Sequence, residues 1–97
     1  MSSVSAQIPS GLTLDQLRAL YKSANALYQQ SWKNEDRARL KLLKAERRFL
    51  VEPLNVVAQG TYVHMRRKHQ NEADTTAATL AIREQVYAAL LKAEASE

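Results

Sequence analysis

The sequence contains no cysteine, which excludes disulfide bridges, thiolate nucleophiles and cysteine-ligated zinc. It has only two glycines and two prolines, too few turn-forming residues for the hairpins of a multi-stranded sheet. No apolar run approaches the roughly 18 residues of a membrane span, and the N-terminal segment has neither the basic nor the apolar region of a secretory signal. We therefore expect an all-α, cytoplasmic protein without a membrane partner.

What the sequence does contain is typical of a folded protein: 45% of its residues are hydrophobic and 25% are charged. A length of 97 residues indicates one domain, which we assign to residues 12–97. The serine-rich residues 1–11 lack periodicity and are expected to form a flexible leader. A helical chain this short buries only about 60 to 65% of its unfolded surface, so a partner is expected to complete the core.

Two long amphipathic helices are predicted, over residues 13–51 and 61–95. Thr13 and Gln16 form a capping box at the start of the first helix. Alternating steps of four and three residues from Leu17 to Phe49 describe a heptad register interrupted only by Ser31 and Glu35, which favours one continuous helix. Pro53 cannot continue that helix, so the fold class predicted is an antiparallel helical hairpin.

The predicted reversal runs from Pro53 to Gly60, with Gly60 as the residue that ends a short helical turn and Thr61 as the cap of the second helix. Two breaks stay open as alternatives, one near residue 34 and one near residue 74, because capping residues occur at both places. Such breaks would convert the hairpin into a three- or four-helix bundle.

One apolar stripe of the first helix supplies the candidate core and the candidate surface for a partner or for self-association. Its members are Leu17, Tyr21, Ala24, Tyr28, Trp32, Leu42 and Phe49. Because this stripe exceeds what two helices bury alone, the function predicted is a non-enzymatic protein–protein interaction module, such as an adaptor, an inhibitor or an assembly subunit. A homo-oligomer is expected.

Positive charge is concentrated in the middle of the chain, where residues 33–68 carry ten Lys and Arg against four acids. Residues 69–97 carry five acids against two basic residues. Candidate contacts to phosphates or to an acidic protein are Arg37, Lys41, Lys44, Arg48, Arg66, Arg67 and Lys68. A nucleic-acid-binding accessory protein is thus the alternative function, and a simple solvated helix face is a third reading.

No motif indicates catalysis, a cofactor, a bound metal or a small-molecule substrate. His64 and His69 lie five residues apart, which places them on different faces of a helix and prevents them from chelating one metal ion together. The sequence therefore predicts a protein that is not an enzyme.

Overall fold

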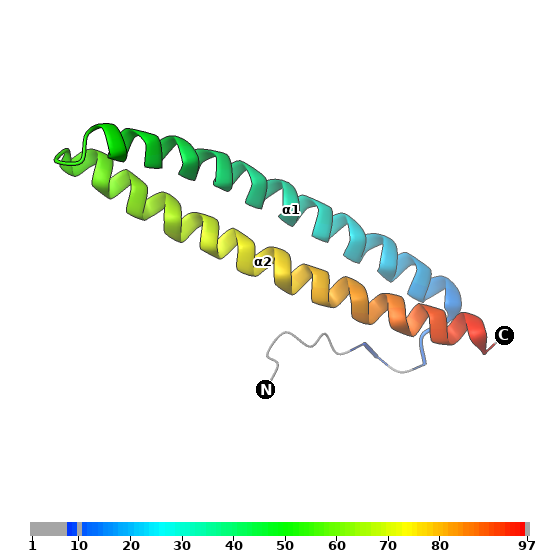
Figure 1. Ribbon diagram of the computed structural model, residues 1–97. Helices are drawn as coiled ribbons and strands as arrows, with labels where there is room; N and C mark the ends of the chain where they lie inside the picture. The colour runs from blue at the N-terminus through cyan, green and yellow to red at the C-terminus, as the bar shows by residue number, and fades with distance from the viewer. Residues whose placement is uncertain (1–7, 10, 97) are drawn as a thin grey trace.

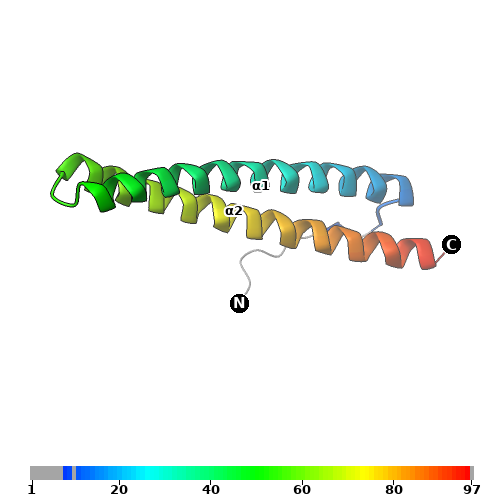
Figure 2. The same ribbon diagram turned by 45° about the horizontal axis from the view of Figure 1, so that its top comes forward.

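The computed structural model describes residues 8–9 and 11–96, which form two long helices (Figure 1). Helix α1 spans Leu14–Val51 and helix α2 spans Val56–Ala95. The helices run antiparallel along their whole length, as both views show (Figures 1 and 2). The predicted all-α helical hairpin is confirmed, whereas the predicted leader falls mostly outside the described residues.

The capping box predicted at the start of α1 is present. The backbone N–H of Gln16 donates to the Thr13 hydroxyl oxygen at 3.2 Å, and the Thr13 N–H donates to Oε1 of Gln16 at 2.9 Å. Both donors would otherwise lack a partner at the helix N-terminus. At the other end α1 stops at Val51, two residues before Pro53, as the missing N–H of proline requires.

The predicted start of the second helix was wrong, because α2 begins five residues earlier than residue 61. Its N-cap is Asn55, whose Oδ1 accepts hydrogen bonds from the N–H groups of Val57 at 2.9 Å and Ala58 at 3.1 Å. Gly60 therefore lies inside the helix rather than at a helix end, and Thr61 caps nothing. Burial of Ala58, which is 0% exposed, helps to offset the helix-weakening effect of the nearby glycine.

Neither of the two breaks considered from the sequence occurs, so the three- or four-helix alternative is also wrong. The side chain of Asn34 accepts a hydrogen bond from Gln30 at 3.1 Å, and that of Asp74 accepts one from Gln70 at 2.9 Å. Each pair is four residues apart along its helix. Both potential caps are thus engaged by helical neighbours, and they support continuity instead of starting a new helix.

The core is a narrow seam between the helices, lined mainly by small residues. On α1 every seventh residue is buried: Leu17, Ala24, Ser31, Ala38 and Ala45. On α2 the buried residues are Ala58, Thr76, Thr79, Val86 and Leu90. The Thr76 hydroxyl links the helices by a hydrogen bond to the carbonyl oxygen of Ser31 at 3.1 Å. Small residues in the seam let the two backbones approach closely.

The hairpin is a single layer of helices. Its Cα atoms extend over 64 × 25 × 14 Å, and the Cα radius of gyration is 19.0 Å. A compact domain of this length would have a radius of about 12.5 Å. Each helix has one neighbour, so both broad sides of the layer face solvent and are available to partners.

Candidate functional site

The predicted apolar stripe divides between the seam and the surface. Leu17 and Ala24 are buried, and Tyr21, Tyr28, Leu42 and Phe49 are half-buried against α2. The ring of Tyr21 lies 5.4 Å from that of Tyr87, and the ring of Phe49 lies 5.3 Å from that of Tyr62. Trp32 differs from the rest because it is 54% exposed. Six members of the stripe therefore serve the intramolecular core, and Trp32 belongs to a surface.

The helical register shows which residues lie on each broad side of the hairpin. Residues that flank the seam on one edge of a helix face one side, and those that flank it on the other edge face the opposite side. Arg18 of α1 pairs with Glu94 of α2 at 3.7 Å on one side. Trp32 lies on that same side, beside a small cavity next to His69. On the other side Lys41 and Lys68 line a common cavity. The sides differ in charge and are described separately.

The first side, which we call the neutral face, combines exposed hydrophobic side chains with nearly balanced charge. Its exposed hydrophobic residues are Trp32, Leu43 and Leu50 of α1, and Val63, Tyr87 and Leu91 of α2. Its basic residues are Arg18, Lys22, Arg39, Arg66 and Arg83, and its acidic residues are Asp15, Glu35, Asp36, Glu46, Glu84 and Glu94. The five positive charges are thus nearly balanced by six negative ones. Apart from Trp32, none of these hydrophobic residues was among the candidate site residues predicted from the sequence. Leu43 and Leu50, like Val63 and Leu91, recur at multiples of seven residues, at a heptad position one step farther from the seam than Trp32 and Tyr87.

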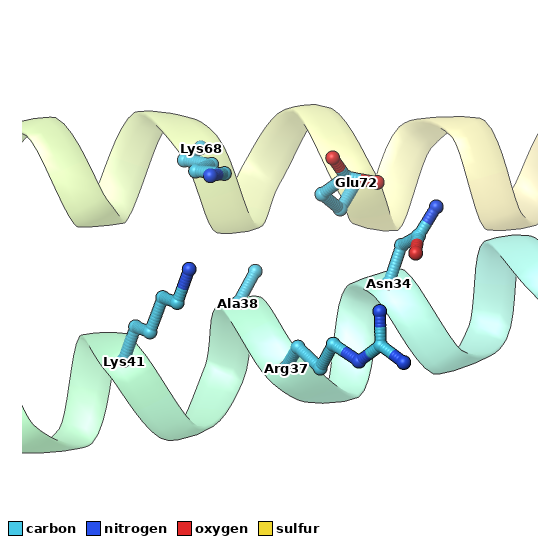
Figure 3. A pocket seen from close by; sticks show the side chains of 6 residues that line it. All are labelled: Asn34, Arg37, Ala38, Lys41, Lys68 and Glu72. Atoms are coloured by element: carbon cyan, nitrogen blue, oxygen red, sulfur yellow. The ribbon is translucent and has the colours of Figure 1, made fainter.

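The second side, which we call the basic face, contains a groove between the helices made of two adjoining cavities. One, of about 300 Å³, is lined by Asn34, Arg37, Ala38, Lys41, Lys68 and Glu72 (Figure 3). The other, of about 280 Å³, is lined by Lys41, Lys44, Ala45, Arg48, Thr61 and Met65. Lys41 belongs to both cavities, so they adjoin at this side chain, and we call the two together the groove. Its border carries five basic side chains, Arg37, Lys41, Lys44, Arg48 and Lys68, and one acidic side chain, Glu72.

Most of these basic groups are not engaged by carboxylates. Among the described residues, only Arg48 of the five forms an ion pair, with Glu52 at 3.5 Å, and both side chains are about half exposed. Exposed pairs of this kind contribute little to stability and exchange readily with other partners. The groove therefore presents a concentration of positive charge to solvent.

The structure does not bring all seven predicted cationic residues together. Arg66 and Arg67 line a different depression, with Val63 and Gln70, away from the groove. The Arg66 guanidinium lies 5.6 Å from the centre of the Tyr62 ring. Five of the seven predicted contacts thus share the groove, while the adjacent pair Arg66 and Arg67 points elsewhere because helical neighbours diverge by about 100°.

The described residues contain no group of three or more His, Asp or Glu side chains placed to hold a metal ion. Neither α1 nor α2 has an apolar stretch long enough to cross a membrane. Comparisons of the chain with protein families, curated proteins and solved structures return no match. The neutral face and the basic face of the hairpin are therefore the features from which a function can be inferred.

Proposed function

We propose that the protein is a non-enzymatic helical interaction module that self-associates by packing the neutral faces of two copies against each other. The main support is the neutral face itself, which presents six exposed large hydrophobic residues with nearly balanced charge, whereas the side of the cation-bordered groove presents three, Leu27, Val51 and Val57. Exposed hydrophobic surface of this extent is typical of interaction sites.

A second copy suits the neutral face for reasons of symmetry and size. In a two-fold dimer the same surface of each copy meets its equivalent, so a face with nearly equal numbers of acids and bases pairs with little net repulsion. Each broad side of the hairpin measures 64 by 25 Å. A stable interface buries about 800 Å² of each partner, which corresponds to about half of the neutral face. Two such layers would form a four-helix arrangement with both basic faces outside.

Trp32 is the best candidate for the centre of this interface. Its side chain is the largest exposed hydrophobic group on the neutral face. Tryptophan is enriched among residues that dominate binding energy. The neighbouring ion pair between Asp36 and Arg39, 2.8 Å long, lies beside it and would form part of a polar rim.

The experiment that tests self-association is sedimentation velocity over a range of protein concentrations around micromolar. We expect a dimer, and we expect Leu43→Glu to weaken it by about tenfold or more by placing a charge in the interface. Leu40→Glu is the matched control, because Leu40 is 55% exposed but lies on the outer side of α1.

Trp32 provides a second readout because it is the only tryptophan. Its emission should shift to shorter wavelength as the dimer forms and the ring leaves water. A monomer at every concentration would overturn the proposal, and so would equal weakening by the Leu40 and Leu43 variants.

As part of the same proposal we place the protein in the cytoplasm, which the absence of cysteine supports.

A further inference from the structure

We infer that the groove on the basic face is a binding site for an acidic amphipathic helix of a partner protein. This inference does not depend on self-association, since it uses the opposite side of the hairpin. The inference is based on the combination of an apolar floor and a border of cationic side chains in this groove.

The floor of the groove is formed mainly by apolar side chains that lie at the level of the seam. Ala38 and Ala45 lie in the seam, only 2% and 6% exposed, and Met65 and Thr61 flank them on α2. Because the two floor residues on α1 are alanines, the α1 part of the floor is formed by short side chains. A third helix could approach to the usual interaxial distance of about 8 to 10 Å and bury its own apolar residues on this floor.

The border of the groove matches the charge spacing of a helix. Arg37, Lys41, Lys44 and Arg48 follow one another at intervals of four, three and four residues, which gives a row about 16 Å long on α1. Lys68 faces this row from α2 across the groove (Figure 3). Carboxylates at intervals of three and four residues on a bound helix would lie beside successive cations.

The acids near the groove lie toward its two ends. Glu72 lines the end nearer the middle of the hairpin, beside Asn34 and Arg37, and Glu52 pairs with Arg48 at the end nearer the turn. Positive charge is therefore most concentrated between these ends, around Lys41, Lys44 and Lys68. The most acidic part of a bound helix would lie there, and a basic or neutral residue would lie beside Glu72.

A nucleic acid fits the groove less well than an acidic helix does. No aromatic side chain lines either cavity of the groove, so bases have no platform on which to stack. Phosphates alone would use the border and leave the floor of Ala45 and Met65 uncovered by any apolar group. The floor is thus the observation that favours a helix over a phosphate backbone.

The test uses a synthetic peptide of about 20 residues with leucine at heptad positions a and d and glutamate at e and g. Its binding to the full chain is measured by fluorescence anisotropy at low and moderate salt. We expect saturable binding that weakens as salt rises and that falls by about tenfold or more in the double variant Lys41→Glu, Lys44→Glu. Circular dichroism of each variant checks that the hairpin is intact.

The matched control is Arg47→Glu combined with Arg67→Glu, which reverses the same number of charges on the outer sides of the helices, outside both the groove and the neutral face. This control should change affinity by less than about threefold. Equal loss in both double variants would overturn the inference, because it would indicate attraction to net charge alone. Absence of peptide binding at low salt would overturn it too.

A competing DNA duplex of about 20 base pairs decides between the two ligand classes. If the duplex displaces the peptide at equal charge concentration, the inference is wrong and the nucleic-acid prediction gains support.

Retention of peptide binding by Leu43→Glu, whose change lies on the neutral face, would show that the groove acts separately from self-association. Failure of one proposal can therefore be told from failure of the other.

Discussion

At the scale of single residues, the recurrence of small side chains in the seam sets how closely the helices approach. Ala38 is 2% exposed and is one of the small residues that α1 contributes to the seam. We predict that Ala38→Leu lowers the free energy of unfolding by about 1 to 3 kcal/mol, because extra methylene groups force the helices apart. Urea denaturation followed by circular dichroism measures the change.

The control for this prediction is Ala26→Leu, which introduces the same group at an exposed position of the same helix. Its effect should stay within about 0.5 kcal/mol. If both variants have the same stability as the original chain, the seam is not as tightly packed as the structure indicates.

Ser31 and Trp32 show why the sequence predicted the seam only in part. The apolar spacing places Trp32, four residues after Tyr28, in the core stripe, and Ser31 interrupts the register. In the structure Ser31 is 4% exposed, and its hydroxyl donates to the Leu27 carbonyl at 2.9 Å. Because the hydroxyl is satisfied within its own helix, burial costs little, and the large ring of Trp32 stays outside a seam that is too narrow for it.

At the scale of helices, the cap at Asn55 controls where α2 begins. Its side chain satisfies the N–H groups of Val57 and Ala58, and no other side chain of the described turn bonds to them. We predict that Asn55→Ala lowers the free energy of unfolding by about 0.5 to 2 kcal/mol. Chemical denaturation of the variant measures the loss.

Asn71→Ala is the comparison for the cap, since Asn71 is exposed in the interior of α2. Alanine has the higher helix propensity, so this variant should be slightly more stable than the original chain. A cap variant as stable as Asn71→Ala would contradict the assigned role of Asn55.

The extent of the helices was largely predictable, but the start of α2 was not. The capping box and Pro53 fixed both ends of α1 because each acts locally through backbone hydrogen bonds. In the turn, Asn55 and Thr61 are both good caps, and sequence alone does not decide between them. The decision comes from the seam, because an early start adds Ala58 to the buried residues.

At the scale of the whole molecule, the fold redistributes the charge seen along the sequence. Within the acidic segment, residues 69–96 fold back beside the start of α1, where Arg18 pairs with Glu94. Negative charge is therefore not concentrated at the open end of the hairpin, whereas the cations of residues 37–68 lie toward the turn. This arrangement could not be predicted from the sequence before the pairing of the helices was known.

A self-associating single layer should also show concentration-dependent stability. Because dimerisation binds only the folded state, the midpoint of thermal unfolding should rise as protein concentration increases. Leu43→Glu should abolish most of this dependence, whereas Leu40→Glu should retain it. Differential scanning calorimetry over about a hundredfold concentration range measures the effect, and a constant midpoint for the original chain would contradict it.

The seven-residue interval between buried positions on α1 also bears on the shape of any partner. An ideal helix drifts by about 20° per heptad against such a repeat, so a seam held from Leu17 to Ala45 favours a left-handed winding of about 80° over its length. Both faces would turn with it, and the groove would follow a spiral path. A partner that contacts the hairpin over its full length must therefore coil around it, and a straight rod would touch it over only a short section.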